Sequence, residues 1–479
     1  MNYYQILKIT GIILLIFSFF IIIPIAASFF YDENIDNFLQ SFLIIFFAGL
    51  LTYFPNKNEK SQIKIREGFF IVAIFWFILS FFGAIPFFLD QDLKFSLVDA
   101  IFESTSGWTT TGATVITNID DLSKPLLLYR QLLQWLGGIG IVVLVLAILP
   151  ILGVGGMYLF KAETSSPVKD NKLSPRITET AKSLWGVYII LTVACAALYK
   201  IAGMNYFDAI GHSFSTVSIG GFSTHDASIG FYSSTSIKII CMIFMFLSAL
   251  NFVLHFLFYK NKSFEVYSSN SEMKTFIFII LILFFLIAIF SLGDRLQSLQ
   301  TIDIIFHVLS FATTSGFTVT NYDVWPTFIL TLIFLSSFIG ACAGSAGGGM
   351  KVIRFTIALK SIKKQLLKVI HPKAEITIKV NDKKVDDMTI ETILSFIILY
   401  IILFFSSSLL IMLSGHDLLT AFSSTAACIN NLGPALGDAF GNYASLNDFS
   451  KSLLLIMMII GRLEIFTFIV LITRYFWKY

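Results

Sequence analysis

Thr109-Thr110-Thr111-Gly112-Ala113 is a short polar stretch between long apolar segments, and three comparable stretches follow it along the chain. They are Val217-Ser218-Ile219-Gly220-Gly221, Thr313-Thr314-Ser315-Gly316-Phe317 and Asn430-Asn431-Leu432-Gly433-Pro434. Irregular polar backbone at membrane depth is tolerated only where it is buried in protein or lines a water-filled path. Four such turns in one chain can surround an axis, so the pattern predicts a pore.

The composition indicates an integral membrane protein. Of the 479 residues, 56% are hydrophobic and only 13% are charged, whereas an average soluble domain has about 25% charged residues. About ten apolar runs approach or exceed the length of roughly 20 residues that crosses a bilayer. They cover 9–30, 41–54, 68–88, 126–160, 184–202, 237–259, 276–292, 327–340, 390–413 and 451–475. We therefore expect an all-α polytopic membrane protein.

The positions of the charges predict an orientation, because loops rich in Lys and Arg stay on the cytoplasmic side. Basic residues follow every second run: Lys57, Lys60, Lys64 and Arg66; Lys161, Lys169, Lys172 and Arg176; Lys260, Lys262 and Lys274; and Lys351, Arg354, Lys360, Lys363, Lys364, Lys368 and Lys373. The opposite loops contain acidic residues such as Asp90, Asp226, Asp294 and Asp438. We expect the four turns to open outward and both termini to be cytoplasmic.

No group of residues indicates an enzyme. Cys195, Cys241, Cys342 and Cys428 are scattered in apolar stretches, where unpaired cysteine behaves as a small buried hydrophobe. The six histidines are far apart and lack metal-ligand spacing. No nucleophile and base recur near one another, so we expect neither catalysis nor a bound cofactor.

Internal repetition organises the chain from residue 68 onward. Each unit contains an apolar helix, a short half-helix, a glycine turn and a second helix. The predicted half-helices are Asp99 to Trp108, Phe207 to Thr216, Asp303 to Ala312 and Asp417 to Ala427. We divide the chain into a two-helix extension at 1–67 and pore repeats at 68–160, 161–262, 263–370 and 371–479, around a central pore.

The half-helices explain why the pore would accept a cation. A half-helix that enters from outside and stops midway directs the negative end of its dipole inward. A glycine after it can adopt backbone conformations closed to other residues, so consecutive carbonyls can face the axis and replace water around an ion. The alternative is that these glycines only allow close helix packing. Four occurrences at matching places favour the pore.

The four turns resemble those of the TrkH/KtrB family of potassium transporters. The matching motifs extend from Ser106 to Thr114, from Ser215 to Ser223, from Ala312 to Phe317 and from Asn430 to Pro434. The resemblance implies that backbone carbonyls at and just before each glycine bind the permeating ion. These belong to Thr110, Thr111 and Gly112; Ser218, Ile219 and Gly220; Thr314, Ser315 and Gly316; and Asn431, Leu432 and Gly433.

The resemblance carries further expectations. Four filter glycines go with a preference for potassium over sodium in this family. The two helices before residue 68 resemble the TrkH branch. The family also implies a bacterial cytoplasmic (inner) membrane, a homodimer, and a cytosolic nucleotide-binding regulator of the TrkA type, for which the basic stretch 353–385 would be a docking site. That stretch would equally suit a lipid-facing surface. No nucleic-acid partner is expected.

A run of glycines interrupts the second helix of the third unit. Gly344, Ser345, Ala346, Gly347, Gly348 and Gly349 lie within the segment from Phe338 to Lys351. Each glycine disfavours a helix interior by about 1 kcal/mol relative to alanine, so the helix should break here. One interpretation is close helix contact through small residues. The other, which the resemblance also implies, is a flexible gate loop that obstructs the pore under the filter.

Arg462 lies near the middle of the last apolar run. A central arginine costs about 2.5–3.5 kcal/mol on insertion scales, so it should face the pore or a partner, such as Glu464 or the carbonyls of the glycine loop. It is either a structural partner or a fixed positive charge that slows cations. We favour the second role and count Arg462 with the gate.

Two functions of different class remain. The first is potassium uptake through a gated, selective single-chain pore. The second is a proton- or sodium-coupled secondary cation symporter, which should expose acidic relay residues within its spans. Glu103 and Glu464 are the candidates for that relay, although Glu103 could instead brace the filter from behind.

Overall fold

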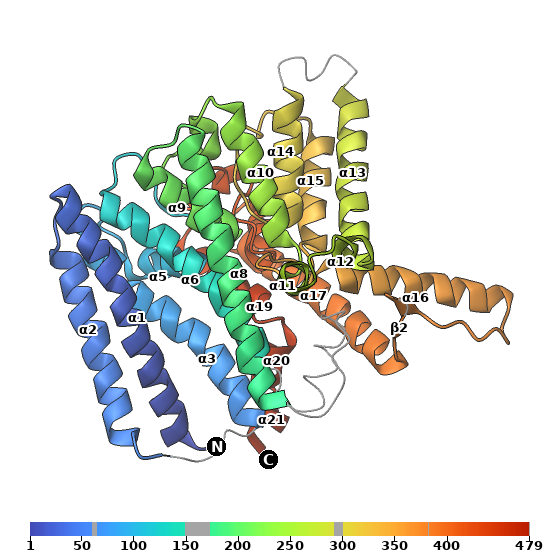
Figure 1. Cartoon of the computed structure of the whole chain (residues 1–479), viewed down its shortest axis with the longest axis horizontal. Helices are drawn as coiled ribbons and strands as arrows, with labels where there is room; N and C mark the ends of the chain where they lie inside the picture. The colour runs from blue at the N-terminus through green and yellow to red at the C-terminus, as the bar shows by residue number, and fades with distance from the viewer. Residues whose placement is uncertain (60–64, 149–172, 292–299, 382, 479) are drawn as a thin grey trace.

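The computed structural model is mainly helical, and it describes residues 1–59, 65–148, 173–291, 300–381 and 383–478. Six of the described helices are long and apolar enough to cross a membrane, or up to eight if each bent pair forms one span. The two termini lie at the same end of the molecule (Figure 1). The prediction of an all-α polytopic membrane protein is confirmed.

The first two helices form an antiparallel hairpin. They are α1 (Tyr3–Tyr31) and α2 (Asp36–Tyr53), and the short 3-10 turn η1 (Phe54–Asn56) follows them. A Cβ on Gly11 would lie 2.6 Å from the backbone nitrogen of Tyr53, and a Cβ on Gly49 would lie 3.0 Å from Leu15. The two helices therefore pack closely near the end of α2, because a glycine on each helix faces its partner one turn apart.

The remaining elements follow the expected order of helix, half-helix, turn and helix. The first two sets are α3 (Ile65–Gly83), α4 (Ile85–Leu89), α5 (Leu97–Trp108) and α6 (Lys124–Ile148), then α8 (Leu173–Ile201), α9 (Tyr206–Val217), η2 (Ser228–Phe231), α10 (Thr235–Ala249) and α11 (Phe252–Asn261). The third set is α12 (Glu265–Ser268), α13 (Ser271–Ser291), α14 (Thr301–Thr313), α15 (Thr327–Ile339) and α16 (Val352–Ile370). The last part comprises β1 (Lys379–Val380), β2 (Lys383–Lys384), α17 (Asp387–Leu413), α18 (Leu418–Ile429), η3 (Gly437–Ala439), α19 (Asp448–Arg462), α20 (Phe466–Ile472) and α21 (Arg474–Lys478).

This order is consistent with four repeats, although the division of the chain at the stated residues stays a prediction. The boundary at residue 160 lies outside the described residues, as do the charges of Lys60, Lys64 and Asp294 and those of the basic loop up to Lys172. The two short strands β1 and β2 pair antiparallel, with Lys379 opposite Lys384.

All four half-helices are present within a few residues of their predicted bounds. They are α5, α9, α14 and α18. Ser96 caps α5, Asn205 caps α9 and Asp417 caps α18, each through a side-chain oxygen that accepts from a backbone N–H of the first turn. Asp99, Asp208 and Asp303 lie in the first turns of their helices, where a negative charge complements the helix dipole.

Three of the predicted spans differ in shape from a straight transmembrane helix. The run 237–259 forms α10 and α11, which are bent by 93°, and the run 451–475 contains α19 and α20, which are bent by 117°. The helix in 327–340 is α15, with only 13 residues. Next to the first bend, Phe252 N–H donates to Gly344 O at 3.1 Å, and Cys342 N–H donates to Ala249 O at 3.0 Å. The break between α10 and α11 is therefore shaped by the glycine loop, a long-range contact that hydrophobic periodicity does not show.

Two largely buried ion pairs each join a half-helix to a helix of another set. Lys451 of α19 lies 2.7 Å from Asp99 of α5, and Lys238 of α10 lies 2.7 Å from Asp303 of α14.

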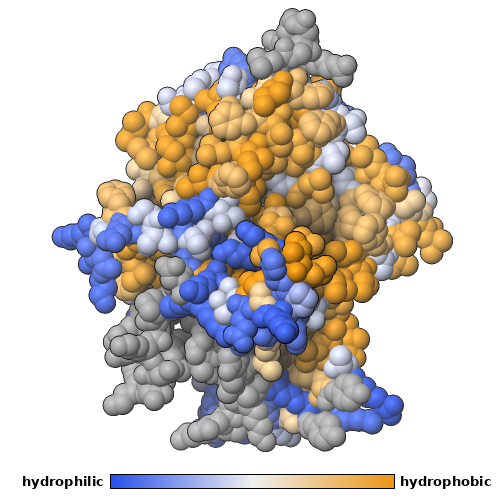
Figure 2. Space-filling view, turned by 90° about the vertical axis from the view of Figure 1, so that its right-hand side faces the viewer, coloured by the Kyte–Doolittle hydropathy of each residue, from blue (hydrophilic) through white to orange (hydrophobic). Residues whose placement is uncertain are grey.

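Viewed from one side, the molecule has a broad hydrophobic surface over its upper part, with hydrophilic residues across the middle and at the bottom (Figure 2). A hydrophobic surface of this extent is typical of a protein that contacts lipid.

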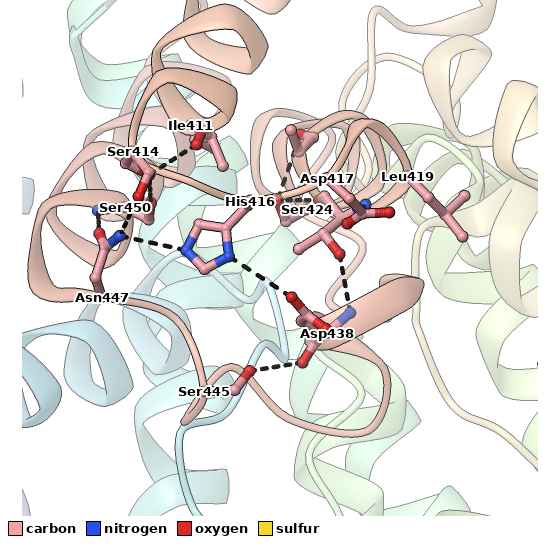
Figure 3. A network of polar contacts seen from close by, with 12 residues as sticks. Ile411, Ser414, His416, Asp417, Leu419, Ser424, Asp438, Ser445, Asn447 and Ser450 are labelled. Atoms are coloured by element: carbon pink, nitrogen blue, oxygen red, sulfur yellow. Dashed lines mark hydrogen bonds and ion pairs between the residues drawn. The ribbon is translucent and has the colours of Figure 1, made fainter.

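A polar network joins the loop after the fourth turn to the helices around it (Figure 3). His416 lies between Asp438, at 3.8 Å, and Asn447, at 3.4 Å. The Ser445 hydroxyl donates to Asp438 O at 2.7 Å, and Asp438 N–H donates to the Thr420 hydroxyl at 2.9 Å. The loop that follows Gly433 is therefore held beside the start of α18.

Candidate functional site

The four turns are closed by the same hydrogen bond. In each, the residue just before the last glycine donates its backbone N–H to the carbonyl five residues earlier, at the end of the half-helix. The pairs are Thr111 to Ser106 at 2.9 Å, and Gly220 to Ser215, Ser315 to Ser310 and Leu432 to Ala427 at 2.8 Å each. The turns are thus structurally equivalent, although the four donor residues are all of different types.

The backbone angles identify the equivalent glycines. Gly112, Gly221, Gly316 and Gly433 have φ values of 81°, 80°, 79° and 90°. Two residues earlier, Thr110, Ile219, Thr314 and Asn431 adopt the left-handed conformation with φ between 52° and 64°. Such a conformation costs of order 1–3 kcal/mol for a non-glycine residue and persists only where the surroundings enforce it.

The second turn therefore has a register one residue later than the sequence indicated. Its equivalent glycine is Gly221, and the three corresponding residues are Ile219, Gly220 and Gly221 in place of Ser218, Ile219 and Gly220. Ser218 is instead the C-cap of α9. Two adjacent glycines made the register ambiguous, because either can supply a positive φ. In the other three turns the predicted residues occupy the equivalent positions.

The four turns contact one another in a closed ring. A Cβ added to Gly433 would lie 2.6 Å from the carbonyl oxygen of Thr111. A Cβ on Gly112 would approach Gly220 O even more closely, and the same holds for Gly221 with Ser315 O and for Gly316 with Leu432 O. Each glycine thus makes room for a carbonyl of the next turn, and the fourth turn returns to the first.

A cavity of about 480 Å³ opens against one side of this ring. The four equivalent glycines, Gly112, Gly221, Gly316 and Gly433, line it, together with residues that follow them in the chain, such as Thr114, Ser223 and Thr318. Gly221 lines the cavity and Gly220 does not appear in its wall, in agreement with the shifted register. The cavity is therefore a vestibule above the ring.

A buried ion pair braces the first turn against the second. The Arg130 Nε donates to Glu103 Oε1 at 2.9 Å, and both side chains are almost fully buried. The Glu103 carboxylate also accepts from Val115 N–H at 3.0 Å, and Arg130 Nη1 donates to Ser223 O at 3.2 Å. Glu103 is thus held by a fixed partner on α6, which supports a bracing role more than a proton relay.

A histidine bridges two carboxylates at the rim of the vestibule. His225 Nδ1 lies 2.6 Å from Asp120, and its Nε2 lies 3.3 Å from Asp208. Burial lowers the pKa of His225, but the hydrogen bonds and charges of Asp208 and Asp120 outweigh burial and raise this pKa above its ordinary value. The ring links the loop after the first turn to the start of α9.

The glycine loop lies on the other side of the ring. The break predicted in the helix is present, because α15 ends at Ile339 and α16 begins at Val352. Gly348 N–H donates to the Thr314 hydroxyl at 2.7 Å, and Gly349 N–H donates to Asn430 O at 3.1 Å. These partners precede the ring glycines in the chain, whereas the vestibule residues follow them. The loop therefore lies directly beneath the third and fourth turns.

Arg462 reaches the tip of this loop. It is the last residue of α19, at the break before α20, so it is not in the middle of a straight span as the sequence suggested. Its Nη1 donates to Ala346 O at 2.8 Å. Within the described part of the chain, the buried Nε and Nη2 have no hydrogen-bond partner. Because a buried charge is weakly screened, Arg462 produces a strong positive electrostatic potential beside the loop.

One charged anchor of the loop, Glu272, was not predicted, and Glu464 has another partner than the expected Arg462. The buried carboxylate of Glu272 accepts from Ala343 N–H at 2.8 Å and from Ile353 N–H at 3.2 Å, so it holds both ends of the loop. Glu464 Oε2 lies 2.6 Å from Arg354 Nη2 on α16. Glu464 is thus engaged with the helix that leaves the loop, which leaves the loop carbonyl as the partner of Arg462.

Comparison with known proteins places this geometry in a family. The family model described as "TrkH: Cation transport protein" matches residues 34–478. The chain belongs to the TrkH family. The resemblance drawn from the turns is thereby confirmed.

Relatives and a solved structure match along the whole length. The Trk system potassium uptake proteins TrkH of Halomonas elongata and Escherichia coli (strain K12) are 46% and 44% identical to this chain, with 100% of each chain covered. The crystal structure of the potassium transporter TrkH from Vibrio parahaemolyticus matches with a TM-score of 0.92 at 41% identity, again over 100% of both chains. This protein therefore has the TrkH fold.

Proposed function

We propose that this protein takes up potassium ions through a gated, selective pore in the bacterial cytoplasmic membrane. The closed ring of four glycine turns carries the proposal, because each turn places a carbonyl beside the glycine of the next. Rings of backbone carbonyls replace the hydration shell of a permeating ion in potassium-selective pores. The names of the full-length relatives support potassium as the cargo.

The proposed filter ligands are the backbone carbonyls of three consecutive residues in each turn. They are Thr110, Thr111 and Gly112; Ile219, Gly220 and Gly221; Thr314, Ser315 and Gly316; and Asn431, Leu432 and Gly433. The carboxyl ends of α5, α9, α14 and α18 approach the same ring, and helix C-termini carry partial negative charge. Neutral carbonyls and dipoles without a carboxylate in the ring suit a monovalent cation. Potassium is here the transported ion and no resident cofactor is proposed.

We propose that the segment from Gly344 to Gly349, with Ser345, Ala346, Gly347 and Gly348 between them, gates this pore together with Arg462. Support comes from the contacts of the loop with Thr314 and Asn430 on the side opposite the vestibule. Arg462 adds a positive charge on the same side and holds the loop through Ala346. The loop obstructs the path and the charge repels cations that approach it.

Replacement of Arg462 with alanine should increase cation flux. The variant loses both the positive charge and the hydrogen bond to Ala346 O. One hydrogen bond from a charged group is worth about 1.5–3 kcal/mol, so an increase of roughly tenfold is expected in rubidium flux into liposomes. Arg462→Lys keeps the charge and serves as the matched control, with flux close to that of the wild type. A lower flux in well-expressed Arg462→Ala would show that Arg462 is not a barrier to cations.

The alternative of a proton- or sodium-coupled symporter is tested by removing the coupling gradient. Purified protein in liposomes should equilibrate rubidium down its own gradient when no proton or sodium gradient is present. Rubidium movement that stops without one of these gradients would favour coupled transport instead. The engagement of Glu103 with Arg130 and of Glu464 with Arg354 supports the pore, since neither carboxylate is available as a simple relay.

The remaining parts of the proposal concern partners and placement. We propose a multi-pass protein with both termini in the cytoplasm, which agrees with their position at one end of the fold (Figure 1). A homodimer and a nucleotide-binding regulator of the TrkA type are proposed from the family. The basic helix α16, with exposed Leu359, Ile362 and Leu366 among its lysines, is the proposed surface for lipid or for that regulator.

A further inference from the structure

One buried side chain contacts the ring itself. Gln134 lies on α6 behind the second turn and is fully buried. Its Nε2 donates to Gly220 O at 2.5 Å, and its Oε1 accepts from Phe222 N–H at 3.1 Å. Because a carbonyl can only accept and a backbone N–H can only donate, these two partners determine the orientation of the amide.

The hydrogen bond makes the second turn different from the other three. Gly220 O is equivalent to the carbonyl oxygens of Thr111, Ser315 and Leu432. No donor to those three oxygens is found among the described residues. One of four equivalent carbonyls is therefore held by a side chain, and the other three are left to the ion.

The same contact explains the second glycine of the Gly220-Gly221 pair. Gly221 is required by its φ of 80°. Gly220 has no positive φ, but a Cβ on it would collide with the side-chain amide of Gln134, with Nε2 only 2.8 Å away. Gly220 and Gln134 thus form a matched pair, and a larger residue at either position would displace the other.

We infer that Gln134 is a selectivity-determining positioning residue, which restrains the Gly220 carbonyl through its side-chain amide. This inference rests on the proposed filter. A smaller ion such as sodium requires the carbonyls to move inward, and a carbonyl tied to a buried amide resists that movement. The amide N–H also takes up part of the acceptor capacity of Gly220 O. Both effects disfavour sodium relative to potassium.

The test is the competition of sodium with rubidium uptake in liposomes. Gln134→Leu removes both hydrogen bonds at nearly constant volume. Sodium should then inhibit rubidium flux at about fivefold lower concentration, the factor that corresponds to the loss of one ordinary hydrogen bond. Gln131→Leu is the matched control, because Gln131 is buried one turn earlier on α6, where it packs against Gly211 and makes, among the described residues, one long hydrogen bond, from Nε2 to Phe222 O at 3.5 Å.

A second pair of variants keeps the inference testable if Gln134→Leu fails to fold. Gly220→Ala should reduce rubidium flux, since its Cβ collides with Gln134. Gly220→Ala combined with Gln134→Ala removes the collision, so flux should return while sodium competes as strongly as in Gln134→Leu. Rescue of flux with wild-type sodium sensitivity would contradict the inference.

The outcome also separates this inference from the filter proposal. Unchanged sodium competition in folded Gln134→Leu, with altered competition in Gly316→Ala, would overturn the role of Gln134 and leave the filter intact. If neither variant alters sodium competition, the filter proposal itself fails.

Discussion

Gly316→Ala is expected to lower rubidium flux by at least about tenfold and to weaken the preference for potassium. Gly316 has φ of 79°, and a Cβ there would collide with Leu432 O and lie 2.7 Å from Pro434 Cδ. The left-handed backbone alone costs an alanine about 1–2 kcal/mol, which corresponds to about tenfold in an equilibrium. The collision adds to this cost because it displaces a proposed ligand of the ion.

A matched control separates backbone strain from the collision in the ring. Gly415 has φ of 105°, and a Cβ on it would meet no heavy atom within 4 Å. Gly415→Ala therefore carries a similar backbone penalty outside the ring and should retain flux and selectivity. Equal losses in the two variants, at equal amounts of folded protein, would mean that general strain explains the effect of Gly316→Ala.

Deletion of residues 344–348 is expected to raise rubidium flux by about tenfold or more. The deletion removes the contact of Gly348 with Thr314 and the carbonyl of Ala346 that Arg462 holds. We expect the base of the loop to survive, because Gly340 packs directly against Gly349, with 2.8 Å between an added Cβ on Gly340 and Gly349 Cα, and Glu272 still holds Ala343 and Ile353. The remaining chain can therefore close without the segment that lies under the ring.

The control for the deletion is a substitution that keeps the loop in place. Ser345→Ala removes two local hydrogen bonds, from the Ser345 hydroxyl to Cys342 O at 2.6 Å and from Gly347 N–H to that hydroxyl at 3.4 Å. Its flux should stay near that of the wild type in the same liposome measurement. If the deleted protein elutes as a folded species and conducts no more than the wild type, the loop does not gate the path.

The parts of the site that sequence could predict are those with a local signal. Each half-helix has an aspartate at its N-cap or in its first turn and is followed by a glycine turn, so the bounds of the half-helices could be predicted to within a few residues. The break before α16 followed from glycines that disfavour a helix interior. The register of three turns could be predicted because each contains a single glycine. The register of the second turn, which contains Gly220 and Gly221, depends on contacts with Gln134 and with the neighbouring turn, which the sequence does not show.

The missed features all depend on long-range contacts. The bend between α10 and α11 forms against the glycine loop, and Glu272 holds that loop from 71 residues away in the chain. Arg130 and Gln134 did carry a signal, since polar residues inside an apolar run are costly in a membrane and mark functional positions. Their partners could not be assigned, because those lie on other half-helices and turns.

The position of the ion itself tests the central claim most directly. Crystals of the protein grown in rubidium should show anomalous density on the axis of the ring, encircled by the carbonyl oxygens of Thr111, Gly220, Ser315 and Leu432. Rubidium bound at other places in the protein, with this ring empty, would contradict the account of the four turns as one cation filter.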